Sequence, residues 1–134
     1  MNDIIKNNNI ETLIKEVIDC CWTIRKHFDA GYLESVYHKA LCVELARRNI
    51  NYNSEQPIPI SYLGEDVGYF IADIIVENQI IIEIKATKQL AVSAEAQLIN
   101  YLTATGIENG LLVNFGSDIL TIKRKFKTYK NSAN

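Results

Sequence analysis

Glycine and proline are scarce in this chain of 134 residues, which has six glycines and two prolines. Collagen-like repeats and many disordered segments are rich in these residues, so their scarcity argues against both classes. Apolar residues make up 48 % of the chain, enough to build a hydrophobic core. At this length we expect residues 1–134 to fold as a single domain.

Long apolar runs are also missing, because no stretch approaches the roughly 20 residues that span a bilayer. The polar start of the chain, MNDIIKNNN, does not resemble a signal peptide. Cys20, Cys21 and Cys42 are spaced neither for a metal site nor for a disulfide framework. His27 and His38 lie in no ligand pattern, so no site role is expected for them. We therefore expect a cytoplasmic protein with reduced thiols and no membrane contact.

A large excess of charge is lacking, because 14 Lys and Arg residues face 16 Asp and Glu residues. The segment KRKFKTYK, residues 123–130, nevertheless holds five basic residues and no acid. Basic groups interleaved with aromatic rings are typical of nucleic-acid contacts. Lys123, Arg124 and Lys125 are therefore candidate phosphate contacts in a basic C-terminal tail, residues 123–134. The alternative is a tail that is merely solvated.

Hydrophobic periodicity predicts three helices and five strands. The helices are expected over residues 10–28, 31–49 and 93–105, and the strands over residues 56–62, 67–76, 80–86, 110–115 and 119–126. Asn9 and Ser93 are candidate N-caps, and Gly106 is expected at the end of the third helix. Pro57 and Pro59 suggest that the first strand lies at a sheet edge. The order ααβββαββ predicts one α/β domain, with a mixed central sheet flanked by helices.

Asp73, Glu83 and Lys85 interrupt two apolar strands in the stretch FIADIIVENQIIIEIKATKQ, residues 70–89. Burying such charges is costly unless they are paired or hold a metal. If residues 77–79 form a three-residue loop, Asp73 lies directly opposite Glu83, and Lys85 shares their face. The other face then forms one apolar surface, made of Phe70, Ala72, Ile74, Val76, Ile80, Ile82, Ile84 and Ala86.

Opposed carboxylates repel across a sheet, with Cβ atoms about 5 Å apart, so a divalent cation that bridges them would explain the pair. Carboxylate oxygens suit Mg²⁺ or Mn²⁺ better than zinc. Lys85 could act beside the metal on a water or an anionic substrate, which suits phosphodiester hydrolysis. The alternative is a salt-bridge network in which Lys85 neutralises one carboxylate.

Two predicted helices could add polar groups to this site. Glu34 lies at the start of an otherwise apolar stripe, where the helix dipole favours a negative charge. Tyr37, one turn later, could bond to Glu34 or to substrate. Gln97 and Tyr101 share one face of the third helix, and Gln97 could position a water or a phosphate. Tyr37 and Tyr101 are thus candidate nucleic-acid contacts, although Glu34 and Gln97 could equally be ordinary surface residues.

The segment GYLESVY, residues 31–37, has the form G-x-x-E-x-x-Y and resembles the GxxExxY protein family of bacteria and archaea. The similarity continues through ADIIVENQIIIEIKA, AQLINYLTATG and GLLVNFG and ends near Lys123-Arg124. That family is placed in the PD-(D/E)xK nuclease-like superfamily. The resemblance therefore implies a restriction-endonuclease-like αβββαβ core, and with it a metal-dependent nuclease.

The resemblance also implies roles for residues at matching positions. Asp73 looks like the metal-binding Asp of the superfamily, and Glu83 and Lys85 look like its (D/E)xK element. In that scheme the Ile84 carbonyl is a further metal ligand, and Lys85 orients and activates the attacking water. Mg²⁺ or Mn²⁺ is the expected cofactor, and DNA or RNA the expected partner.

Glu34 looks like the helix carboxylate that often completes the metal site, and Gln97 like the polar residue of the following helix. The chain departs from the pattern at Ala72, where the superfamily name has Pro, and at Ala94, where the family often has His. The resulting hypothesis is a metal-dependent nuclease-like protein that could form a homodimer. The competing hypothesis is a non-catalytic binding or scaffold module with the same fold.

Overall fold

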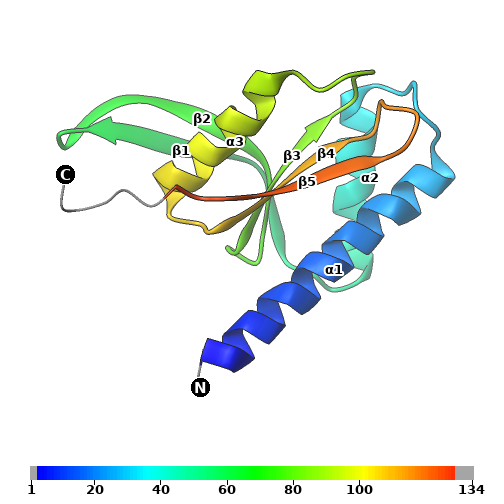
Figure 1. The fold of residues 1–134 in the computed structure, drawn as a ribbon, viewed down its shortest axis with the longest axis horizontal. Helices are drawn as coiled ribbons and strands as arrows, with labels where there is room; N and C mark the ends of the chain where they lie inside the picture. Colours follow the sequence, from blue (N-terminus) through cyan, green and yellow to red (C-terminus); the bar gives the residue numbers. More distant parts are fainter. Residues whose placement is uncertain (1–2, 129–134) are drawn as a thin grey trace.

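The protein is described here by a computed structural model of residues 3–128 (Figure 1). Its elements are α1 (Asp3–His27), α2 (Glu34–Arg47), β1 (Tyr52–Tyr62), β2 (Glu65–Val76), β3 (Ile80–Lys85), α3 (Val92–Thr105), β4 (Asn109–Asn114) and β5 (Thr121–Phe126). This is the predicted order of helices and strands. None of the helices in the described residues is long and apolar enough to cross a membrane.

The five strands form one mixed sheet in the order β1-β2-β3-β4-β5. β3 and β4 are parallel and are joined through α3, whereas the other neighbours are antiparallel. β1 lies at an edge of the sheet, as Pro57 and Pro59 predicted. The predicted α/β class with a mixed sheet flanked by helices is confirmed.

Helices cover both faces of the sheet. One apolar cluster joins α1 and α2 to Ile80, Ile82 and Ile84 of β3. A second cluster joins α3 to Ile81 of the same strand and to Leu112 of β4. Because β3 is buried on both sides, its sequence reads as a nearly continuous apolar run, in which a charged residue is unexpected.

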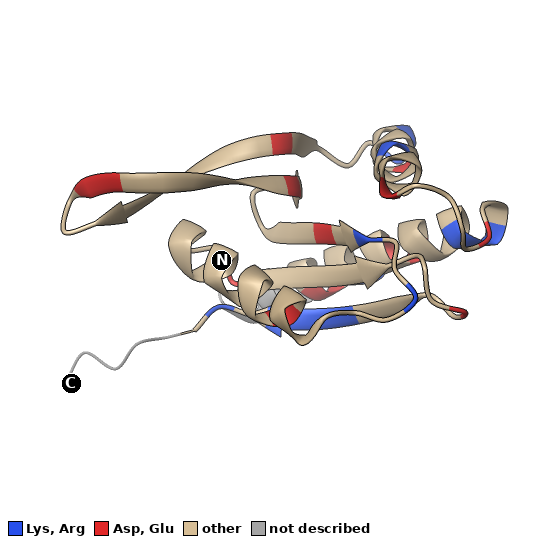
Figure 2. Cartoon of the chain, turned by 90° about the horizontal axis from the view of Figure 1, so that it is seen from above, with Lys and Arg blue, Asp and Glu red and all other residues tan. Residues whose placement is uncertain are grey.

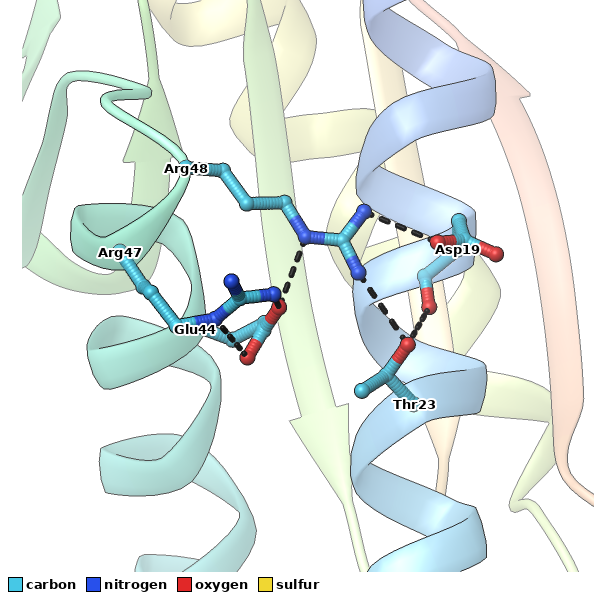
Figure 3. A network of polar contacts seen from close by, with 5 residues as sticks. All are labelled: Asp19, Thr23, Glu44, Arg47 and Arg48. Carbon is cyan, nitrogen blue, oxygen red and sulfur yellow. Dashed lines mark hydrogen bonds and ion pairs between the residues drawn. The ribbon is translucent and has the colours of Figure 1, made fainter.

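A polar network ties α1 to the end of α2 (Figure 3). The Arg48 guanidinium donates to Glu44 Oε2 at 2.7 Å, to Asp19 Oδ2 at 2.9 Å and to Thr23 Oγ1 at 3.2 Å. Arg47 also bonds to Glu44, and these two guanidinium groups lower the pKa of the Glu44 carboxyl to about 2. The network holds the C-terminal end of α2 against α1.

β1 and β2 extend beyond the sheet as a two-stranded ribbon (Figure 1). Their pairing runs from Tyr52 opposite Val76 to Tyr62 opposite Glu65. β2 pairs with β3 only over the short stretch from Ile74 to Val76. The rest of β2 therefore leaves the sheet, and a gap opens between β2 and β3 where Asp73 and Glu83 lie.

The predicted apolar surface along β2 is wrong in its first half. Phe70 and Ala72 pack against α3, whereas Ile74 and Val76 pack against α1 and α2. The change of face coincides with a backbone irregularity in β1 opposite Asp73, where Glu55 has a positive φ of 54°. Such an irregularity bends a strand and turns its later side chains to a new face, which sequence alternation cannot reveal.

The ends of the elements were predicted less well than their order. Asn9 lies inside α1, and the N-cap position of α3 is Ala91. Asn9 and Ser93 therefore do not cap their helices, contrary to the prediction. Gly106 does end α3, with a φ of 77° and its N–H donating to the Leu102 carbonyl. Neither wrong cap affects the core, because the packing of apolar stripes tolerates helix ends that shift by a turn.

Candidate active site

Asp73 and Glu83 meet where the β2–β3 ladder opens. Val76 pairs with Ile80, as the predicted three-residue loop requires, so Asp73 falls opposite Glu83. The Asp73 N–H donates to Glu83 Oε2 at 3.0 Å, and the Ile84 N–H donates to Asp73 Oδ2 at 2.8 Å. Each carboxylate thus accepts a bond from the backbone of the neighbouring strand and takes the place of a ladder bond.

Burial changes the acidity of this pair. The Glu83 side chain is 8 % exposed and Asp73 is half-buried. Burial, and after it the negative charge of Asp73, raises the pKa of the Glu83 carboxyl to about 8. Removing a carboxylate from water disfavours its charged form, and a second carboxylate beside it does so further. Burial and the neighbouring charge therefore favour a protonated pair when no cation is bound.

Lys85 lies two residues beyond Glu83 on the same face of β3 and is half-buried. In the part of the chain that the structure describes, no ion pair within 4.0 Å joins Lys85 to Asp73 or to Glu83. The salt-bridge network considered as an alternative is therefore not formed. Lys85 brings a positive charge near the pair without neutralising either carboxylate directly.

Asn114 anchors the chain immediately after Lys85. It pairs with Lys85 across the parallel strands and is 1 % exposed. Its Oδ1 accepts from the Thr87 and Gly116 N–H groups, each at 3.0 Å, and its Nδ2 donates to the Thr87 carbonyl at 2.8 Å. Next to it, the Phe115 N–H donates to the Lys85 carbonyl at 2.8 Å. Sequence reasoning missed Asn114, although an Asn at the end of the apolar run GLLV was a visible signal.

Gly116 shows how closely this anchor is packed. A Cβ atom at this position would lie 2.3 Å from the Thr87 nitrogen and 2.4 Å from the Ala86 carbonyl carbon. Only a residue without a side chain lets the loop after β4 approach the segment after β3 so closely. The backbone that follows Lys85 is therefore held on two sides.

Tyr101 of α3 lies near the carboxylate pair, and Gln97 lies one turn before it on the same helix. The Tyr101 ring stacks on Phe70 with centroids 3.6 Å apart. Burial, followed by the charges of Glu83 and Asp73, raises the pKa of the Tyr101 hydroxyl, and a hydrogen bond from Gln97 opposes this rise. Gln97 is exposed and lines, with Tyr101, a cavity of about 620 Å³ between α3 and the ribbon.

A second pocket, of about 240 Å³, lies between α2 and the root of the ribbon. It is lined by Glu34, Ser35, His38, Lys39, Cys42, Ser54, Glu55 and Asp73. Glu34 thus shares a pocket with Asp73, and its side chain is exposed. His38 lies here too, with Nε2 2.8 Å from Ser54 Oγ. His38 lies four residues after Glu34, on the same face of α2.

The predicted nucleic-acid contact at Tyr37 is wrong. Its side chain is fully buried and stacks on Phe115, with ring centroids 4.7 Å apart. The Tyr37 hydroxyl donates to the Asp29 carbonyl and accepts from the Tyr32 N–H. Tyr37 therefore holds the loop that leads into Glu34, and a polynucleotide cannot reach it.

The basic residues predicted to form a tail lie partly in β5 (Figure 2). Lys123 and Lys125 both form ion pairs with Glu95 of α3, and Arg124 forms one with Glu11 of α1 at 2.7 Å. These three side chains are held by acids, so they are not part of a solvated tail. Residues 129–134 of the predicted tail lie outside the described residues.

The oxygen ligands of the pair suit a divalent cation. Among the described residues, no three His, Cys, Asp or Glu side chains are grouped closely enough to hold a metal ion, so Glu34 does not complete such a group. Mg²⁺, however, is often bound by one or two carboxylates together with waters and substrate phosphates. Asp73 and Glu83 fit that mode of binding.

Comparisons with known proteins agree with this arrangement. A model of the PD-(D/E)XK nuclease superfamily matches residues 11–128. The chain belongs to this superfamily. The mixed sheet and three helices of residues 3–128 are consistent with the restriction-endonuclease-like fold, and PD-(D/E)XK nucleases typically use divalent metals.

The crystal structure of a protein called SSO0001 has a similar fold. It is 23 % identical, with a TM-score of 0.59, and the match covers 72 % of this PD-(D/E)XK chain and 50 % of that one. This likeness supports the fold alone, and the present chain matches only half the length of that protein. Of the curated proteins compared, none matches the chain.

Proposed function

We propose that this protein is a metal-dependent nuclease that hydrolyses phosphodiester bonds in nucleic acid. The observation that supports the proposal is the reciprocal bonding of Asp73 and Glu83 at the β2–β3 gap, with Lys85 on the same face. The sequence GYLESVY further supports a GxxExxY type of PD-(D/E)XK protein. Its reduced thiols, Cys20, Cys21 and Cys42, suit a cytoplasmic location.

In the proposed site, Asp73, Glu83 and the Ile84 carbonyl hold Mg²⁺ or Mn²⁺, and Glu34 contributes through water. The bound cation would supply Lewis acidity toward a phosphate oxygen and a more acidic water. Glu83 gives up its proton when the site is loaded, because a carboxylate ligand must be ionised. Lys85 orients the attacking water and stabilises the charge that develops on the phosphate. Gln97 positions the water or the phosphate.

The register of the sheet suggests where the nucleic acid lies. Glu83 pairs with Leu112, and Leu112 pairs with Lys123, so the three side chains share one face of the sheet. Adjacent strands are about 4.8 Å apart, which puts Lys123 roughly 10 Å from the carboxylate pair. Lys125 lies on this face as well, and both lysines contact Glu95 of α3. We therefore assign Tyr101, Lys123 and Lys125 as phosphate or base contacts, with Arg124 at the margin.

Titration of Mn²⁺ by calorimetry, combined with a cleavage assay, tests this function. Wild type should bind Mn²⁺ and cut a supercoiled plasmid or a single-stranded RNA, whereas Asp73→Asn should do neither. Asp66→Asn, which removes an exposed carboxylate at the ribbon tip, is the matched control and should behave like wild type. A wild-type protein that binds no Mn²⁺ contradicts the metal site.

The competing function is a non-catalytic binding module. It is favoured by one observation: the buried carboxylates are already bonded to backbone N–H groups without a metal. If wild type binds Mn²⁺ and nucleic acid but leaves both substrates intact, this alternative replaces the nuclease.

A further inference from the structure

The ribbon of β1 and β2 exposes an apolar face that packs against nothing in the described chain. Ile58 and Phe70 pack with the α3 cluster, so the side chains next to them along each strand point the other way. These are Pro57 and Pro59 of β1 and, directly opposite them, Ile71 and Tyr69 of β2. All four are exposed, Tyr69 to 69 % and Ile71 to 49 %. We call them the outer face of the ribbon.

Charge argues against nucleic acid as the occupant of the outer face. Residues 49–84 contain six Asp and Glu residues but no Lys or Arg. Glu65 and Asp66 lie at the tip of the ribbon, where Figure 2 shows acidic and no basic colour. Polynucleotides bind chiefly through basic contacts to phosphate, so this segment repels them. Exposed apolar surface of this kind more often marks a protein interface.

The free edge of β1 does not favour a partner that binds by adding a strand to the sheet. Pro57 and Pro59 have no N–H to donate, so β1 is poorly suited to accept an added strand. A partner must therefore pack on the outer face, as one sheet packs on another. Its contact surface should be apolar and free of buried charge, as homodimer interfaces are at their centre.

A second copy of this chain meets these requirements, and its charges match. Lys39 of α2 lines the pocket at the root of the ribbon and forms no ion pair within the described residues. Tyr62, which pairs with Glu65 at the tip, lies seven residues along β1 from Glu55 at the root, a span of about 23 Å. In an antiparallel arrangement of two ribbons, each acidic tip therefore reaches the root of the other copy. A parallel arrangement would instead bring the two acidic tips together.

We propose that the outer face is a self-association surface, on which two copies pack about a twofold axis with their ribbons antiparallel. Pro57, Pro59, Tyr69 and Ile71 form its apolar centre. Glu65 and Asp66 of each copy lie beside Lys39 of the other. An isologous contact of this kind closes on itself, so it produces a dimer and not a filament. The dimer does not depend on nuclease activity.

Sedimentation velocity of the full chain, over about a hundredfold range of concentration, tests this surface. Wild type should dimerise, and Tyr69→Glu should raise the dissociation constant at least about tenfold, because it buries a charge. Ile119→Glu changes a similarly exposed apolar residue, in the loop before β5, and should have no effect. Circular dichroism melts verify that each variant is folded. A monomeric wild type, or a dimer that tolerates Tyr69→Glu, overturns the proposal.

A charge swap tests the antiparallel arrangement. Lys39→Glu alone, or Glu65→Lys with Asp66→Lys, should weaken the dimer, and the three changes together should restore it. If the triple variant dimerises more weakly than either partial variant, the antiparallel arrangement is wrong. If wild type is a monomer and Tyr69→Glu instead weakens binding to a single-stranded oligonucleotide, the outer face is a nucleic-acid surface and the proposal is wrong.

Discussion

The Asp73 N–H donates to the Glu83 carboxylate, while the Asp73 carboxylate accepts from the N–H of the residue after Glu83. The two acids thus hold together the point at which two strands separate. Backbone N–H groups stabilise the ionised form of a carboxylate, but burial and the neighbouring charge oppose ionisation of Glu83. The metal-free site therefore keeps one proton that a cation would displace.

This proton predicts how stability depends on pH. Folding raises the pKa of Glu83 from 4.5 to about 8. The protonated Glu83 therefore contributes to the free energy of unfolding fully below pH 4.5, and this contribution is lost as the pH rises through 8. Glu83→Gln should remove that loss and make the metal-free protein roughly 1–3 kcal/mol more stable than wild type above pH 8. Urea unfolding at a series of pH values measures the difference.

Glu16→Gln is the control for this experiment, because Glu16 is exposed on α1 and should leave the pH profile unchanged. Parallel profiles for wild type and Glu83→Gln between pH 5 and 9 contradict a raised pKa for Glu83.

The opposition of Asp73 and Glu83 could be predicted because strand alternation and loop length determine register. The turn at residues 77–79 allowed one register that buried the isoleucines, and the structure has that register. The role of Asn114 could not be predicted, since its partners Thr87 and Gly116 lie in loops. Alternation also gave no sign of the irregularity at Glu55, which depends on the backbone conformation of a single residue.

Asn114→Ala should loosen the segment that follows Lys85, because the Asn114 side chain bonds to Thr87 and Gly116. It leaves the partly buried Thr87 and Gly116 N–H groups without their acceptor, at a cost of roughly 1 kcal/mol. Because Phe115 and Thr87 hold the segment after Lys85, the affinity for Mn²⁺ should fall as well. Calorimetry and thermal melts give the two effects separately. Asn53→Ala, an exposed Asn on β1, should change neither.

The basic residues of β5 should contribute to nucleic-acid binding according to the face of the sheet on which they lie. Lys123 and Lys125 face α3 with Glu83, whereas Arg124 faces α1 and pairs with Glu11. Lys123→Gln and Lys125→Gln should each lower the slope of log K against log salt by about 0.7 to 0.9 for nucleic-acid binding. Arg124→Gln, the matched control, should change it less. Equal slopes for all three variants mean that the α3 face does not carry the nucleic acid.

Substitution of Lys85 should separate a catalytic role from a structural one, because the two roles predict different effects on cleavage and on stability. It forms no ion pair with Asp73 or Glu83 within the described residues, so Lys85→Ala should change the free energy of unfolding by less than about 1 kcal/mol. Its positive charge lowers the pKa of Glu83 and would repel a bound cation. Lys85→Ala should therefore bind Mn²⁺ at least as tightly as wild type.

Cleavage by Lys85→Ala should nevertheless fall by about a hundredfold or more, as expected when a group that stabilises transition-state charge is removed. Lys85→Arg keeps the charge but not the compact ammonium, so it should recover only part of the rate. Calorimetry, urea unfolding and single-turnover cleavage of the same preparations give the three quantities. A Lys85→Ala protein that cleaves at the wild-type rate removes Lys85 from the mechanism. One that loses Mn²⁺ binding together with stability makes Lys85 a structural residue, because a catalytic group would change the rate alone.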